Sequence, residues 1–190
     1  ASFPEALQIE QNANVKVYPT QNYTEADWRQ YRYAYYRLVE KVDKEIGRII
    51  DAIDDLDLRE NTVIIFTSDH GDGNASHGWN QKTALFQESI KVPFIVSHKN
   101  VVASNQSINT TLVSNGLDLY PTICDYAGIS ISDDFLGKSI KPVAEGKKKK
   151  NEREYVVVET KFEGRNANGT LGRAVVTKKK QICYLQLGEA

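Results

Sequence analysis

An acid and an imidazole stand side by side just after a short apolar run, and of all residues in this chain they are the best suited to chemistry. Asp69 and His70 follow the run Val63–Phe66 and precede Gly71. A carboxylate beside an imidazole offers one hard oxygen donor and one nitrogen donor, which together are half of a metal site. Polar residues are also common in ordinary surface loops. From these residues alone, a metal or catalytic site and a simple polar turn are both open.

A polar, glycine-containing segment continues from this point over residues 72–82. It contains His77 and ends at Lys82, before a helix-like stretch over residues 83–89. Taken singly, His77 is more often an ordinary surface histidine and Lys82 a solvated charge. Because both occur in one long polar segment directly after the acid–imidazole pair, the combination predicts an active-site loop.

Two apolar runs flank this loop and predict strands. Val63–Phe66 is short, β-branched and aromatic, as expected of a strand that is buried on both faces of a parallel or mixed sheet. Val92–Val96 predicts a second buried strand. In open α/β sheets, ligands bind beyond the carboxyl ends of the strands, which is where the acid–imidazole pair would emerge. Gly71 would let the chain turn at once.

A long amphipathic helix is predicted upstream of these strands. Thr24 and Asp27 form a helix-capping pattern, and apolar residues then recur at steps of three and four as far as Leu56. We expect this apolar stripe to lie in the core, and Gly47 to mark a close approach of the helix to the sheet. Residues 1–22 are predicted to be irregular.

The C-terminal part predicts a helix that starts near Asn115 and then a change of architecture. Gly146 and the lysines over 147–150 mark a linker; the lysine run reads as a solvated loop, with a grip on an anionic polysaccharide as the alternative. Three strand-like runs predict a small antiparallel sheet, and they cover residues 155–159, 173–177 and 182–185. We therefore predict a catalytic α/β portion over 1–145 and a small antiparallel subdomain over 146–190.

Composition limits the classes of protein that fit. The 190 residues are 41% hydrophobic and 26% charged with a formal net charge of -1, which is typical of a globular protein. This charge gives no general attraction to nucleic acid or to anionic membranes, and no stretch approaches the roughly 20 apolar residues that a membrane span needs. Two cysteines cannot define a disulfide framework, and Cys124 is predicted to be a small core residue.

Four segments resemble, in order and spacing, the second half of the arylsulfatase-like enzymes, the sulfatase family of the alkaline phosphatase superfamily. They are Ser68–Gly71, His77–Gly78, Lys82 and Glu88–Val96. The resemblance covers most of residues 24–187. It implies an α/β fold in which part of a mixed, mostly parallel sheet is flanked by helices and is followed by a small C-terminal antiparallel sheet.

The resemblance also implies a chemistry for the loop. In a sulfuric ester hydrolase of this family, Asp69 and His70 would bind a divalent metal ion. Lys82 would neutralise the sulfate oxygens and the charge that develops on the leaving oxygen, and His77 would help to protonate that oxygen. The implied metal is Ca²⁺; because imidazole suits Mn²⁺ or Zn²⁺ better, those ions, or an orienting role for His70, are alternatives. The implied partner is a sulfated carbohydrate or an aryl sulfate ester.

One departure from the family pattern concerns the nucleophile. Sulfatases carry a Cys/Ser-x-Pro-x-Arg motif, whose first residue is oxidised to formylglycine, and an early pair of aspartates that share the metal. Neither Cys124 nor Cys183 lies in such a motif. We therefore expect this chain to be the C-terminal part of a longer enzyme, inactive without the rest of the catalytic domain and its formylglycine. The family implies an exported protein, whether periplasmic, extracellular or lysosomal, and the oligomeric state is open.

Two other functions fit the same residues. A phosphonate or phosphate ester hydrolase of the same superfamily would carry an acid, imidazole and lysine at this spacing. A non-catalytic carbohydrate-binding module that has kept the scaffold is the alternative from another class. The nucleophile in the rest of the protein and a metal titration would separate them.

Overall fold

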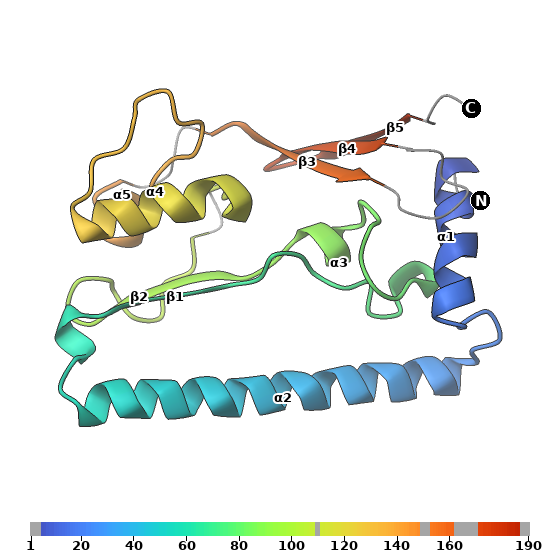
Figure 1. Ribbon diagram of the computed structural model, residues 1–190, viewed down its shortest axis with the longest axis horizontal. Coiled ribbons are helices and arrows are strands. Elements are labelled where there is room, and N and C mark those ends of the chain that lie inside the picture. Colours follow the sequence, from blue (N-terminus) through green and yellow to red (C-terminus); the bar gives the residue numbers. More distant parts are fainter. Residues whose placement is uncertain (1–4, 109–110, 149–152, 162–170, 187–190) are drawn as a thin grey trace.

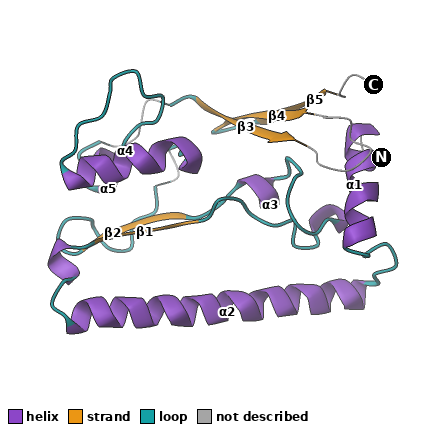
Figure 2. Cartoon of the chain, in the orientation of Figure 1, coloured by secondary structure: helices purple, strands orange, loops and turns teal. Residues whose placement is uncertain are grey.

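The computed structural model describes residues 5–108, 111–148, 153–161 and 171–186. Its helices are α1 (Glu5–Val17), α2 (Glu25–Asp55), α3 (Gln87–Ile90), α4 (Asn115–Ala127) and α5 (Lys141–Ala144), with short 3₁₀ turns at Arg59–Asn61 and Ser76–Gly78. Its strands are β1 (Val63–Thr67), β2 (Phe94–His98), β3 (Tyr155–Lys161), β4 (Leu171–Thr177) and β5 (Gln181–Gln186). Figures 1 and 2 show α2 running along one side of the β1–β2 pair, with α4 and α5 on the other side.

Helix α2 begins where the capping pattern predicts. The Thr24 backbone N–H donates to the Asp27 carboxylate at 2.7 Å, and the Asp27 backbone N–H donates to the Thr24 hydroxyl at 3.3 Å. These bonds satisfy two N–H groups that a helix start leaves without an intrahelical partner. No described helix is long and apolar enough to cross a membrane.

The apolar stripe of α2 is not in the core of this chain, so that prediction is wrong. None of the residues of α2 is buried, and Tyr33 and Ile49 are 60% and 62% exposed. A Cβ added at Gly47 would have no heavy atom within 4 Å beyond the helix itself, so Gly47 marks no close approach to the sheet. The pattern is amphipathic as predicted, but no described element covers most of the apolar face.

Strands β1 and β2 form an antiparallel pair in which Thr67 lies opposite Phe94. The mixed α/β class is confirmed. Both sheets in the described part of the chain are antiparallel, so the mostly parallel sheet stays a prediction. The predicted full burial of the two strands is wrong. Every residue of the pair is half-buried or exposed, up to 55% for Ile95, since the described elements do not cover both faces of a two-stranded sheet.

The C-terminal strands form the predicted antiparallel sheet, in the order β3–β4–β5. This sheet docks on the segment that follows Lys82. The Thr160 hydroxyl donates to the Thr83 carbonyl at 3.2 Å, and the Gln181 amide donates to the Leu85 carbonyl at 2.6 Å. The division between residues 145 and 146 stays a prediction.

Helix α1 corrects the expectation that residues 1–22 are irregular. Leu7 of this helix packs with Trp79 and Ala84 in a buried apolar cluster. The Asn14 amide also donates to the Asn80 carbonyl at 3.2 Å. The helix therefore depends on contacts with the loop after β1, which lies more than 60 residues away in the sequence.

Helix α4 begins near Asn115 as predicted, and its start is fixed by a buried acid. Asp118 accepts from the Ser114 backbone N–H at 2.8 Å and from the Lys138 backbone N–H at 2.9 Å. Arg153 neutralises the same carboxylate, whose side chain is fully buried. A buried charge that is paired and hydrogen-bonded in this way holds the chain around it in one arrangement. Cys124 is buried in this helix, as predicted.

Candidate functional site

The acid and the imidazole emerge directly after β1, in a segment whose backbone packs closely on the turn before β2. The Gly71 N–H donates to the Ser89 carbonyl at 2.8 Å. A Cβ on Gly71 would overlap the backbone carbonyl of Glu88, and no larger residue fits there without movement. Gly71 is not among the residues with positive φ. Its role is therefore close packing of the two backbones, rather than the turn that the sequence predicts.

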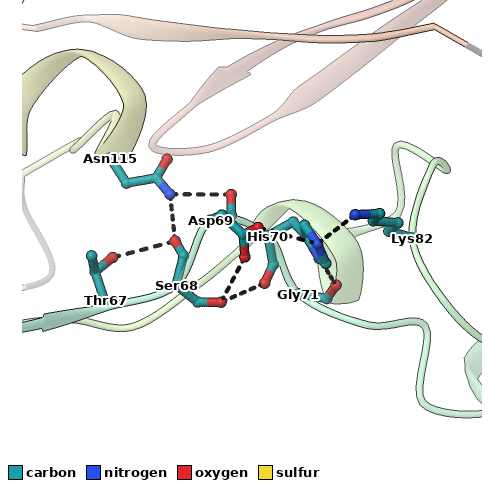
Figure 3. Close-up of polar contacts among 7 residues, drawn as sticks. All are labelled: Thr67, Ser68, Asp69, His70, Gly71, Lys82 and Asn115. Atoms are coloured by element: carbon teal, nitrogen blue, oxygen red, sulfur yellow. Dashed lines mark hydrogen bonds and ion pairs between the residues drawn. The ribbon is translucent and has the colours of Figure 1, made fainter.

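The start of α4 holds the other side of this segment. The Asn115 side-chain amide donates to the backbone carbonyls of Ser68 and Asp69, the second at 3.2 Å (Figure 3). Sequence reasoning treats Asn115 only as a helix start. The residue was missed as a site residue because its partners lie 46 and 47 positions away.

The Asp69 carboxylate is turned outward, with its side chain 82% exposed. Its Oδ1 accepts the His70 backbone N–H at 2.9 Å and lies 3.4 Å from the Ser68 hydroxyl. The bond from the His70 N–H holds the pKa of the Asp69 carboxyl below its usual range. The group is therefore an ionised, accessible oxygen donor at neutral pH.

The His70 ring is held between a carbonyl and an ammonium group. Its Nδ1 lies 2.8 Å from the Gly71 carbonyl, and its Nε2 lies 2.9 Å from Lys82 Nζ and 3.4 Å from Asp69 Oδ2 (Figure 3). A lysine ammonium can only donate, so in this contact Nε2 must be the acceptor and Nδ1 must carry the proton. This is the tautomer in which a carbonyl orients the ring and leaves the outer nitrogen free to act as a ligand.

Lys82 reaches His70 from a loop whose backbone is fixed by a buried tryptophan. The indole N–H of Trp79 donates to the Lys82 carbonyl at 3.2 Å, and Trp79 is only 1% exposed. The neighbouring Thr83 hydroxyl donates to Glu10 of α1 at 2.9 Å. The ammonium end is exposed, while the backbone that carries it is anchored on both sides.

His77 lies on the same loop but has other partners. It adopts a left-handed backbone conformation, with φ of 58°, and its ring stacks on Phe86 at 4.4 Å between centroids. Its Nε2 is 3.8 Å from a Glu88 carboxylate oxygen. The structure thus brings Asp69, His70 and Lys82 into one cluster, and it places His77 beside Phe86 and Glu88.

Two family models match this chain. The model described as Sulfatase matches residues 8–129, which is more than half of the chain. This chain belongs to the sulfatase family. A second model, N-sulphoglucosamine sulphohydrolase, C-terminal, matches residues 75–186 and includes the antiparallel sheet.

Known sulfatases resemble the chain over only part of their own length. A delta 4,5-hexuronate-2-O-sulfatase of Bacteroides thetaiotaomicron is 32% identical over 139 residues, which are 73% of this chain and 29% of the relative. A solved 2-O GAG sulfatase has a TM-score of 0.80 at 30% identity, covering 87% of this chain and 36% of that one. A phosphonate monoester hydrolase of Agrobacterium radiobacter shares the fold, with a TM-score of 0.67 at 24% identity over 87% of this chain and 36% of that one.

Asp69 and His70, two members of this cluster, have the donor groups of part of a metal site. Asp69 supplies an ionised oxygen and His70 a nitrogen lone pair, and the two atoms lie 3.4 Å apart. Among the described residues, no group of three or more His, Cys, Asp or Glu side chains could hold a metal ion. A divalent cation held here would therefore need further ligands from outside these residues, as expected if this chain provides half of the site.

Proposed function

We propose that the complete protein to which this chain belongs hydrolyses a sulfate ester, with a sulfated carbohydrate as its substrate class. The observation that supports this most strongly is the contact of Lys82 Nζ with His70 Nε2 at 2.9 Å, beside the Asp69 carboxylate. An anion-binding ammonium and a pair of metal-type donors thus meet at one point. The carbohydrate class is supported by the names of the hexuronate and GAG sulfatases that the chain resembles.

In this proposal, Asp69 and His70 hold a divalent cation together with residues outside the described part of the chain. Ca²⁺ is our first choice because Asp69 offers hard oxygen donors, and Mn²⁺ or Zn²⁺ are the alternatives because His70 offers a nitrogen. When bound, such a cation neutralises and polarises sulfate oxygens. The formylglycine nucleophile is expected in the rest of the catalytic domain, so we propose that these 190 residues are inactive alone.

Lys82 serves the sulfate group in this proposal. Its ammonium is a compact positive charge that stabilises the sulfate oxygens and the negative charge that develops on the leaving oxygen. His70 Nε2 has a single lone pair, so Lys82 must leave this nitrogen whenever the lone pair serves as a ligand. Lys82 is then available to the anion while its backbone stays fixed by Trp79.

His77 is proposed as the proton donor to the leaving oxygen. An imidazole can supply a proton near neutral pH, and the side chain is 49% exposed, so a substrate can approach it. The ring position is set by stacking on Phe86. This role is separate from the cluster of Asp69, His70 and Lys82.

The proposal is tested with the complete protein by measuring turnover of nitrophenyl sulfate, nitrophenyl phosphate and a phosphonate monoester. We expect sulfate ester hydrolysis to dominate, to be lost after treatment with EDTA, and to return best with Ca²⁺.

A preference for the phosphonate would instead establish the alternative hydrolase of the same superfamily, which the shared fold of the phosphonate monoester hydrolase supports. Saccharide binding without metal binding and without turnover would favour a non-catalytic carbohydrate-binding module. Either result would contradict the proposal.

A further inference from the structure

A groove with only positive charge among its ionisable groups lies between the C-terminal sheet and the β1–β2 part of the chain. Its volume is about 650 Å³, and its cationic side is formed by Lys91 and by the three lysines of the β4–β5 turn, Lys178–Lys180. No Asp or Glu is among its lining residues. The floor includes the valines Val156, Val158 and Val176 of the C-terminal sheet.

The four lysines of this groove form no ion pair with any acid of the described residues. Other cations of the chain do: Lys141 lies 3.5 Å from Asp125, and Arg173 lies 2.5 Å from Glu159. Four ammonium groups that no described acid pairs with repel one another around this groove and raise the local concentration of anions. The groove therefore has the charge of an anion-binding site.

The turn that carries three of these lysines is held in one shape by its own hydrogen bonds. The Thr177 hydroxyl accepts the backbone N–H groups of Lys179 at 3.3 Å and Lys180 at 2.9 Å. The Thr177 backbone N–H also donates to the Lys180 carbonyl at 2.8 Å. A turn fixed in this way presents its lysines with less loss of backbone entropy when a ligand binds.

The groove is connected to the proposed catalytic site at two points. Gln181, which follows the lysine turn, is bonded to the Leu85 carbonyl and to Gln87 in the segment after Lys82. Asn115 also lines the groove, and its side-chain amide donates to the carbonyl of Asp69 at 3.2 Å. A chain-like substrate with one sulfate at the cluster could therefore continue into this groove.

We propose that the groove binds a second negative group of the substrate, so that the preferred substrate is an oligosaccharide with several sulfate or carboxylate groups. This inference rests on the proposed function. The lysines of the turn recognise the negative groups, and the apolar floor lies against the C–H faces of a sugar ring. The lysines do not take part in the reaction; they increase affinity for extended, highly charged substrates.

The test uses the complete protein and a heparin-derived tetrasaccharide as the probe, with the neutral chitin tetrasaccharide as a comparison. The test variant is Lys178→Gln/Lys179→Gln/Lys180→Gln. The matched control is Lys41→Gln/Lys138→Gln/Lys148→Gln, which removes the same charge at exposed positions outside the groove. Calorimetry at low and high salt gives the affinity, thermal unfolding reports folding, and turnover of nitrophenyl sulfate reports the catalytic site.

We expect the groove variant to bind the heparin tetrasaccharide roughly tenfold more weakly, as three partly exposed charge pairs would predict. Its binding should also depend less on salt, because fewer charges are screened. The control variant should bind the heparin tetrasaccharide as the wild-type protein does. Both variants should keep the wild-type melting temperature and the wild-type turnover of nitrophenyl sulfate. Equal weakening by the two variants, or none by the groove variant, would overturn the groove proposal. If the wild-type protein does not hydrolyse nitrophenyl sulfate at all, this result would instead contradict the proposed function.

Discussion

The loop after β1 and the helix α2 differ in how far the chain itself completes their surroundings. Around the loop, the Gly71 backbone packs on the turn before β2, Trp79 donates to the Lys82 carbonyl, and Asn115 of α4 donates to the Asp69 carbonyl. In α2, a strongly amphipathic helix leaves its apolar stripe largely uncovered. The comparison teaches that the site is preorganised by local packing, whereas the long helix is a framework whose apolar face needs further elements to bury it.

The largest difference between the loop after β1 and helix α2 is expected in the effect of substitutions on enzymatic activity. In the complete protein, Lys82→Ala should lower sulfate ester turnover roughly 100- to 1,000-fold, because a charge that stabilises the transition state is lost. Lys44→Ala removes an equal charge from an exposed position of α2 and should leave turnover unchanged. Steady-state kinetics and thermal unfolding of both variants check this. Wild-type turnover in the Lys82→Ala protein would remove that residue from the mechanism.

A pair of glycine substitutions compares packing in the two regions. Gly71→Ala should destabilise the protein by about 1–3 kcal/mol, because the added methyl group overlaps the Glu88 carbonyl. Gly47→Ala should stabilise this chain by up to about 1 kcal/mol, because alanine favours a helix and the site is open. Urea unfolding gives both values. In this chain, a destabilising Gly47→Ala together with a neutral Gly71→Ala would reverse our account of which region is closely packed.

Asn115→Ala should weaken the link between α4 and the end of β1. The two carbonyls of Ser68 and Asp69 lose their donor, which costs about 1–2 kcal/mol in stability. Affinity of the complete protein for Ca²⁺ should also fall roughly tenfold, since residues that orient metal ligands have effects of this order. Titration calorimetry measures that affinity. An unchanged affinity would mean that Asn115 has only a structural role.

Trp79→Phe tests how Lys82 is held. Phenylalanine keeps most of the buried apolar volume but cannot donate to the Lys82 carbonyl, so a loss of about 1 kcal/mol is expected. Turnover in the complete protein should fall by less than it does for Lys82→Ala. If Trp79→Phe and Lys82→Ala lower turnover equally, the tryptophan does more than fix the loop.

The smallest effect is expected on the apolar face of α2. Leu38→Gln changes a side chain that is 60% exposed, so the stability of this chain should change by no more than about 0.5 kcal/mol. The same substitution should cost more in the complete protein if other elements cover this face. Equal, small effects in both proteins would show that the stripe stays exposed.

Local signals made much of the fold predictable. The capping box at Thr24, the start of α4 and the three C-terminal strands were predicted because each depends on residues close together in the sequence. The extent of α1 was not predictable, because its packing depends on a cluster with Trp79. Burial of strands and of the α2 stripe was overestimated for a related reason: periodicity shows which face is apolar but not what covers it.

The candidate site was predictable as a set of residues but not as a geometry. Asp69 and His70 are adjacent in the sequence, so their proximity is local, and the resemblance to sulfatases supplied Lys82. The supporting contacts of Trp79 and Asn115 could not be predicted from the sequence. Both side chains donate to backbone carbonyls, and every residue type has such a carbonyl, so the sequence does not indicate which one is the acceptor. The roles of Asp69, His70, His77 and Lys82 stay predictions.

The most direct measurement of the central claim is a crystal structure of the complete protein with Mn²⁺ and sulfate, in which the metal is located by its anomalous signal. The account predicts a metal peak in contact with the Asp69 carboxylate and His70 Nε2, and a sulfate whose oxygens contact Lys82 Nζ. A metal peak away from both side chains, or a sulfate that Lys82 does not reach, would contradict it.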